Sequence, residues 1–122
     1  MKPKYHLLNN TKYALNGIKS MLIRESSFKL EIACIMPLLI FSFFLDVSSI
    51  THLILVFSLL FILVVESLNS AIEACVDLIT DDFHNLAEIA KDCASSAVFF
   101  SIANAVIIWT YVLYDVFKAK IY

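Results

Sequence analysis

Apolar residues gather into three long stretches along the chain, and two short polar connections separate them. The middle stretch is uncharged from Leu53 to Val65, and the last one is uncharged from Ala94 to Tyr114. A helix that crosses a bilayer needs about 20 predominantly apolar residues, with a range of about 17–25. The pattern therefore predicts three transmembrane helices, at about residues 30–46, 50–79 and 94–117.

The segment before these stretches, at about residues 4–29, mixes apolar and basic residues at helical spacing. Its apolar positions are Leu7, Leu8, Leu15, Ile18, Leu22 and Ile23, and its basic positions include Lys12, Lys19, Arg24 and Lys29. This arrangement is typical of a helix that lies in the membrane surface. We therefore predict an all-α membrane protein with a single domain over residues 1–122, in which an N-terminal amphipathic surface helix precedes three transmembrane helices.

The composition agrees with a membrane protein and excludes several kinds of nucleotide site. Hydrophobic residues make up 61% of the chain and charged residues 16%, against about 45–50% and about 25% in soluble domains. The single glycine, Gly17, excludes a Walker A loop and the glycine-rich loops of Rossmann folds and protein kinases, which need two or three glycines. The net charge of −2 gives no basis for a nucleic-acid partner.

The distribution of basic residues predicts the orientation of the chain. Residues 1–29 contain most of the Lys and Arg and a single acid, Glu25, whereas the turn at 46–52 contains no Lys or Arg. Cytoplasmic segments close to a membrane carry an excess of Lys and Arg. We therefore place the N-terminus and the connection at 80–92 in the cytoplasm, and the turn at 46–52 outside.

The three cysteines, Cys34, Cys75 and Cys93, lie in apolar surroundings and form no CxxC motif. Free cysteine is among the most frequently buried residue types. We therefore expect all three to be small buried hydrophobic residues, and we expect neither a disulfide nor a zinc site.

The middle apolar stretch ends in a polar face made of Glu66, Asn69, Ser70, Glu73 and Asp77. At about 100° per residue, these positions share one side of a helix. A charged side chain at the centre of a membrane helix costs roughly 2.5–3.5 kcal/mol on insertion scales, so several acids on one helix need compensation. Two interpretations stay open. The acids could pair with lysines of neighbouring segments, or they could form a metal or proton site at the cytoplasmic interface.

We favour the metal or proton site, because few cations are available for pairing inside the apolar stretches. Carboxylates suit hard cations such as Mg²⁺, and Glu25 at the end of the basic segment is a natural further carboxylate. The polar connection also contributes Lys91, which can neutralise phosphate oxygens where no glycine-rich loop is available.

Two motifs resemble the signature of the small prokaryotic integral-membrane diacylglycerol kinases. They are "ESLNSAIEACVD", at 66–77, and "FHNLAEIAKDCASSAV", at 83–98. The resemblance extends over nearly the whole chain, including "RESSFKLE" and the turn "LDVSSIT". It implies a multi-pass homotrimer of the bacterial cytoplasmic (inner) membrane, with sites between protomers, which transfers the γ-phosphate of Mg-ATP to the hydroxyl of diacylglycerol to give phosphatidic acid.

The resemblance also implies roles for individual residues. Glu66 corresponds to the general base, which Asn69 supports, and Glu25 and Glu73 correspond to the glutamates that hold Mg²⁺. The implied ATP-binding residues are Tyr13, Glu25, Glu73, Asp82, Phe83, His84, Lys91 and Asp92. The implied lipid-substrate residues are His6, Lys19, Glu31, Asp46, Glu66, Ser95 and Trp109, and some of these positions are structural. For Asp77 we predict only a link from the end of its helix to the surface helix or the loop.

The chain departs from the family pattern at two positions. His6 stands where the family often has an arginine, for which Lys4 is a substitute, and Leu78 stands where an arginine frequently follows the first motif. The position of Leu78 also tends to be apolar in the related undecaprenol kinases. "FLDVSSITHLILVF" and "VIIWTYVLY" look more like the diacylglycerol branch. The alternatives are an undecaprenol kinase and a non-enzymatic membrane subunit with a cation or proton relay.

Overall fold

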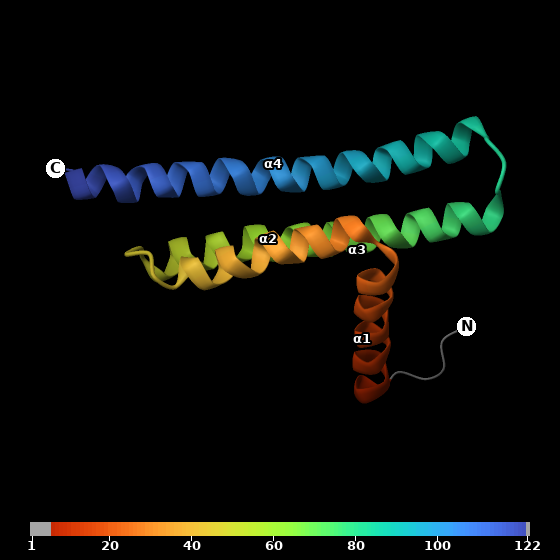
Figure 1. Cartoon of the computed structure of the whole chain (residues 1–122), viewed down its shortest axis with the longest axis horizontal. Coiled ribbons are helices and arrows are strands. Elements are labelled where there is room, and N and C mark those ends of the chain that lie inside the picture. The colour runs from red at the N-terminus through yellow and green to blue at the C-terminus, as the bar shows by residue number, and fades with distance from the viewer. Residues whose placement is uncertain (1–5, 122) are drawn as a thin grey trace. The chain divides into compact units, whose positions relative to one another are not determined.

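The computed structural model describes residues 6–121, which form four α-helices and no strand (Figure 1). The helices are α1 (Leu7–Arg24), α2 (Ser26–Ser42), α3 (Ser49–Ile79) and α4 (Asn85–Ile121). The chain divides into an N-terminal unit up to Cys34 and a C-terminal unit from Ile35 onward. The predicted all-α class is confirmed for the described residues, whereas the predicted helix start near Lys4, and Lys4 itself, lie outside them.

Helices α3 and α4, with 31 and 37 residues, are long and apolar enough to cross a membrane. They are the two candidate spans among residues 6–121. Helix α2 has 17 residues and contains Pro37. A span at about 30–46 therefore stays a prediction.

The N-terminal helix ends earlier than predicted. Helix α1 stops at Arg24, and α2 begins at Ser26, so residues 26–29 belong to α2 instead of the surface helix. Glu25 lies between them in an extended conformation, with φ −117° and ψ 112°. The helix dipoles favour this break. Arg24 lies at the C-terminal end of α1, where the dipole is negative, and Glu25 lies at the N-terminal end of α2, where the dipole is positive.

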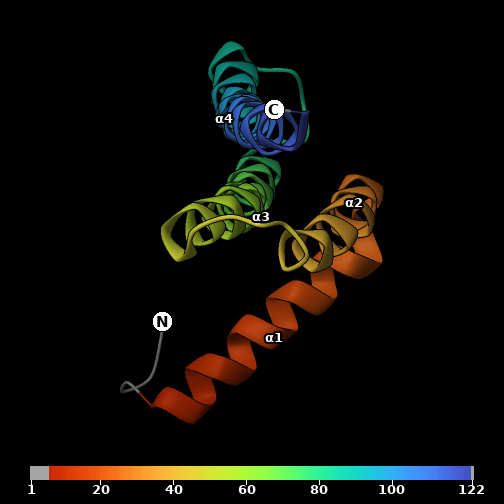
Figure 2. The same cartoon turned by 90° about the vertical axis from the view of Figure 1, so that its left-hand side faces the viewer.

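Helices α3 and α4 pack side by side and run in opposite directions (Figures 1 and 2). The core of the C-terminal unit consists of Ile35, Leu55, Leu59, Ile62, Ala105 and Trp109. Within it, the indole N–H of Trp109 donates to Ser58 Oγ at 3.1 Å, and the Ser58 hydroxyl donates to the carbonyl of Leu55 at 2.7 Å. A buried indole N–H needs such an acceptor, so this hydrogen bond favours one register between α3 and α4.

The connection between α3 and α4 is shorter than predicted. It covers residues 80–84, and the polar residues from Asn85 to Asp92 form the first turns of α4 instead of a loop. The backbone N–H of Leu86 donates to His84 Nδ1 at 3.1 Å, which satisfies one of the free donors at the start of the helix. No glycine or proline interrupts this segment, so the helix extends beyond the apolar run.

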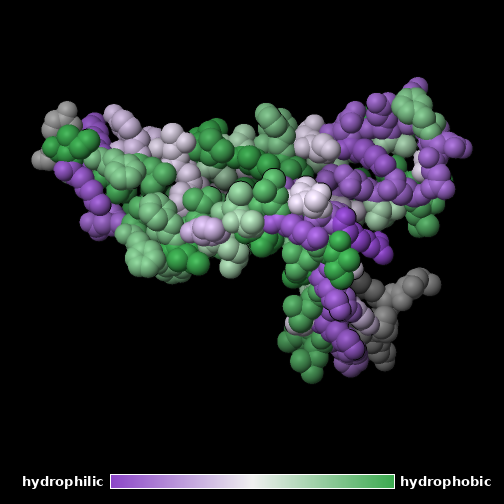
Figure 3. Space-filling view, viewed as in Figure 1, coloured by the Kyte–Doolittle hydropathy of each residue, from purple (hydrophilic) through white to green (hydrophobic). Residues whose placement is uncertain are grey.

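The prediction that the cysteines are buried is wrong, because Cys34, Cys75 and Cys93 are all exposed in the single chain. Apolar side chains cover much of the surface along α4, whereas hydrophilic side chains gather where α3 passes into α4 (Figure 3). A chain whose outer surface is apolar has no need to keep its small hydrophobic residues inside. An apolar stretch of the sequence therefore does not show that its residues are buried inside this protein.

Candidate functional site

The polar face of α3 changes from buried to exposed along the helix. Glu66 and Asn69 are only 4% and 9% exposed, Glu73 is half-buried, and Asp77 is exposed. The order follows the chain from the apolar middle of α3 towards its connection with α4. The acids therefore differ in burial, and Glu66 is the one most enclosed by the protein.

Asn69 contacts Glu73, one helical turn further along α3. Its amide Nδ2 donates to Glu73 Oε1 at 3.3 Å. This hydrogen bond orients Glu73, and the support of Glu66 by Asn69 stays a prediction. The amide oxygen, Asn69 Oδ1, is buried and accepts no hydrogen bond from the described residues. A buried acceptor without a donor generally costs about 1–3 kcal/mol, so this oxygen is available to a ligand with positive charge or a donor group.

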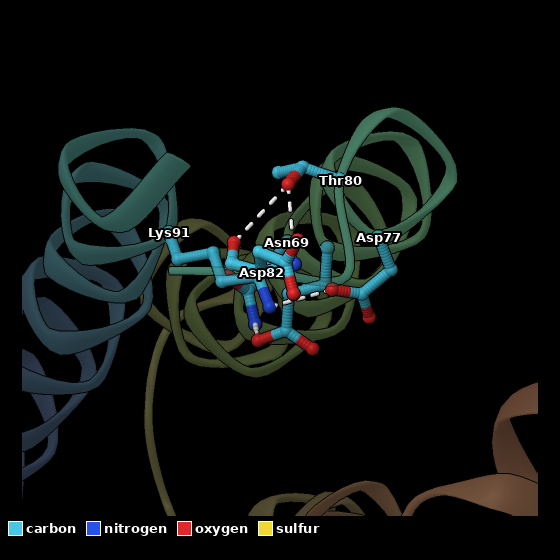
Figure 4. Close-up of polar contacts among 6 residues, drawn as sticks. Asn69, Asp77, Thr80, Asp82 and Lys91 are labelled. Atoms are coloured by element: carbon cyan, nitrogen blue, oxygen red, sulfur yellow. Dashed lines mark hydrogen bonds and ion pairs between the residues drawn. The ribbon is translucent and has the colours of Figure 1, made fainter. Parts of the chain in front are cut away.

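Asp77 forms an ion pair with Lys91 of α4. The Lys91 Nζ donates to Asp77 Oδ1 at 2.6 Å, with the side chains 42% and 63% exposed respectively (Figure 4). This hydrogen bond, with the charges of Asp77 and Glu73, raises the pKa of Lys91 above its ordinary value of 10.5 against a weaker opposing effect of burial. Asp77 thus links the end of α3 to Lys91, which the sequence placed in the connection at 80–92 and the structure places on α4, and pairing with a lysine is the correct interpretation for this acid.

An open pocket of about 300 Å³ lies beside this ion pair. Its walls include four of the predicted ATP-binding residues, Asp82, Phe83, His84 and Lys91. The Thr80 hydroxyl holds the loop in shape, because it donates to the carbonyl of Asp82 at 3.1 Å and accepts from the Asp82 backbone N–H at 3.2 Å (Figure 4). Sequence reasoning missed Thr80, although Thr hydroxyls often bond the backbone two residues further along in turns.

Several predicted site residues lie in the N-terminal unit. Tyr13 and Lys19 are exposed on α1, His6 precedes α1, Glu25 separates α1 from α2, and Glu31 is half-buried on α2. The pairing of Glu25 with Glu73 therefore stays a prediction. Within residues 6–121, no three His, Cys, Asp or Glu side chains come together as metal ligands.

The remaining predicted residues lie outside the pocket. Asp92 and Ser95 are exposed on α4. Asp46 lines a different pocket of about 260 Å³, with Tyr111 and Asp115. Trp109 is buried in the seam between α3 and α4, where it contacts Ser58. Its position is structural in the single chain, and a lipid contact for Trp109 stays a prediction.

The side-chain oxygen atoms of Asn69 and Glu73 on α3 suit a magnesium ion. Mg²⁺ prefers hard oxygen ligands and commonly binds through one or two carboxylates together with substrate phosphates. Glu73 offers a carboxylate that Asn69 orients, and Asn69 Oδ1 is an oxygen without a donor. These two residues fit the ligand preference of Mg²⁺, and neither of them lines the pocket beside Asp77.

Comparison with known proteins identifies the family. Residues 12–113 match the family model of prokaryotic diacylglycerol kinase. Over 105 residues the chain is 38% identical to a diacylglycerol kinase of Escherichia coli K12, a match that covers 86% of each protein. It is 39% identical to a diacylglycerol kinase of Haemophilus influenzae over 112 residues, 89% of this chain and 92% of that protein. It is also 36% identical to an undecaprenol kinase of Bacillus subtilis over 96 residues, 78% of each. The chain therefore belongs to the prokaryotic diacylglycerol kinase family.

Proposed function

We propose that this protein transfers the γ-phosphate of Mg-ATP to the hydroxyl of diacylglycerol, which gives phosphatidic acid and ADP. The observation that supports the proposal most directly is the gradient of burial along α3. Buried Glu66 lies towards the apolar middle of the helix, and the exposed end of the helix meets a pocket lined by Asp82, His84 and Lys91. We assign the lipid hydroxyl to Glu66, which is enclosed by the protein in the single chain, and the nucleotide to the open pocket.

Phosphoryl transfer depends on positioning and on neutralising charge more than on covalent help from the protein. In the proposed reaction, Glu66 takes the proton of the lipid hydroxyl as that oxygen bonds to the γ-phosphorus and the bond to ADP breaks. Glu66 and Glu73 are two helical turns apart, or about 11 Å. The transferred phosphoryl group fits between them.

We assign the magnesium ion to Glu73 and Glu25. When bound, Mg²⁺ neutralises charge on the phosphates. The chain contributes the orientation of Glu73 through Asn69, and Lys91 supplies a positive charge at the pocket. Tyr13, Phe83 and Asp92 are proposed nucleotide contacts, and His6, Lys19, Glu31, Asp46 and Ser95 are proposed lipid contacts.

The lipid acceptor is tested by assaying the purified protein with Mg-ATP in mixed micelles that contain either diacylglycerol or undecaprenol. We expect diacylglycerol to be the faster acceptor. Phosphorylation of undecaprenol alone would instead agree with Leu78 and with the Bacillus subtilis relative, and it would contradict the proposal. The non-enzymatic alternative predicts that neither lipid is phosphorylated.

We also propose the topology that the sequence predicts, with α1 on the cytoplasmic surface and α2, α3 and α4 as three spans of the bacterial inner membrane. The 17 residues of α2 lie at the lower limit of about 17–25 for a span. The connection at residues 80–84 and the pocket beside it are then cytoplasmic, where ATP is available.

A homotrimer with sites between protomers is supported by an exposed amide on α4. Asn104 lies midway between Ala94 and Tyr114, is exposed in the single chain, and has no side-chain partner among the described residues. Exposed Phe100 and Ile107 lie three or four residues from it on the same face. An amide at the centre of a bilayer is most stable when a neighbouring helix supplies a hydrogen bond.

Replacing Asn104 with valine should therefore weaken the assembly. An interhelical hydrogen bond in a membrane is worth about 1 kcal/mol, so we expect a loss of about fivefold in the association constant for each amide contact. Chemical crosslinking over a detergent dilution series measures this change. Asn104→Gln should retain much of the assembly, and Thr110→Val, at another exposed polar position of α4, is the matched control. Equal assembly of Asn104→Val and the wild type would show that this face does not join protomers.

A further inference from the structure

Lys91 is the basic residue at the pocket end of α3 and α4. In the described part of the C-terminal unit, the other lysines are Lys118 and Lys120, in the last turn of α4, and His84 also lines the pocket. Around the pocket, Lys91 is accompanied by four acids, Asp77, Asp81, Asp82 and Glu88. Among the described residues of this unit, Lys91 is therefore the one ammonium group at the pocket.

The ion pair determines where that ammonium group lies. Lysine has a flexible four-carbon stem and three N–H donors. The contact of 2.6 Å with Asp77 Oδ1 uses one of these donors and ties the stem, which starts on α4, to the end of α3. Two donors remain, and the side chain is 42% exposed at the wall of the pocket.

The contribution of this ion pair to folding stability is a weak explanation for its presence. Exposed ion pairs generally contribute little to folding free energy, because water screens the charges and both side chains lose conformational freedom. Holding the same two side chains at a binding pocket has a larger effect on ligand affinity, because the ligand then binds to a group that is already ordered.

We propose that Asp77 is a positioning residue for nucleotide binding, which holds the Lys91 ammonium so that its two remaining N–H donors face the phosphate oxygens. This inference rests on the proposed kinase function. Asp77 does not touch the reacting atoms in this proposal, and it acts through Lys91. The raised pKa of Lys91 agrees with the proposal, since the ammonium stays charged beside the acid.

Two substitutions that remove one negative charge from the same pocket test the proposal. Asp77→Asn removes the partner of Lys91, whereas Asp81→Asn removes a carboxylate that also lines the pocket but does not pair with Lys91. We expect Asp77→Asn to raise KM for ATP about tenfold with kcat changed less than about twofold, since ordered binding is lost and the chemical step is not. Asp81→Asn should leave KM unchanged or lower it. Asp77→Glu should restore most of the affinity.

A double substitution separates positioning from a general effect of charge. In the Lys91→Ala background, Asp77→Asn should cause no further increase in KM, because its effect acts through the lysine. An Asp77→Asn effect equal to that of Asp81→Asn, or one that persists without Lys91, would overturn the inference. Measuring the Kd of Mg-ATP at equilibrium, without lipid, compares the same variants independently of turnover. A wild-type protein that phosphorylates no lipid would instead refute the proposed function itself.

Discussion

Glu66→Gln is expected to reduce lipid-kinase turnover about a thousandfold, with KM for ATP little changed. General base catalysis typically contributes about 10²–10⁴-fold to a rate, and a glutamine amide cannot accept the hydroxyl proton. Glu66 is only 4% exposed and lies on the polar face of α3, away from the pocket at the end of the helix. The substitution therefore removes a group next to the lipid hydroxyl without changing the nucleotide pocket.

The initial rate of lipid phosphorylation is measured in mixed micelles as a function of the lipid concentration and of the ATP concentration. Glutamine nearly matches glutamate in size, so the fold should be retained, and circular dichroism verifies this. Asp115→Asn, an exposed acid that the proposed site does not use, is the control for loss of one negative charge. Wild-type turnover in Glu66→Gln would contradict the assignment of the base.

Glu73→Gln is expected to raise the concentration of free Mg²⁺ needed for half-maximal turnover about a hundredfold. The physical reason is that a neutral amide is a much weaker ligand for a hard dication than a carboxylate is. Glu73 is also the partner of Asn69, which donates to Oε1 at 3.3 Å. Glutamine keeps an oxygen that accepts from Asn69 Nδ2, so the substitution weakens binding of the cation and leaves an acceptor for the buried amide.

A magnesium titration at fixed ATP distinguishes the two glutamates. Excess Mg²⁺ should restore part of the turnover of Glu73→Gln and none of that of Glu66→Gln, because mass action can compensate for weak binding but not for a missing base. The same dependence on Mg²⁺ in Glu73→Gln and the wild type would argue against Glu73 as a metal ligand.

Local patterns in the chain were enough to predict its helical elements and the polar face of α3. A helix repeats every 3.6 residues, so Glu66, Asn69, Glu73 and Asp77 must share one side of any uninterrupted helix. The structure contains that helix from Ser49 to Ile79. The family signature was recognisable for a related reason, since both motifs are continuous in sequence.

Helix ends were less predictable, because neither glycine nor proline marks them. The break at Glu25 depends on opposing charges at two helix ends, and the start of α4 at Asn85 depends on a hydrogen bond accepted by His84. These are interactions of single side chains, and polarity averaged over a segment does not report them. Averaged polarity therefore predicts a loop over residues 85–92, where the structure has the first turns of α4.

By itself, the sequence determined that this is an all-α chain with long apolar helices, and it determined which residues of α3 share a face, because helical periodicity is local. Only the tertiary structure decided which residues meet across helices. Asp77 pairs with Lys91 across 14 positions, and Ser58 accepts from Trp109 across 51. Both contacts depend on the register between antiparallel α3 and α4, which is set by side-chain packing over the whole seam. That register places Asp77 next to Lys91 at the pocket, which explains this acid.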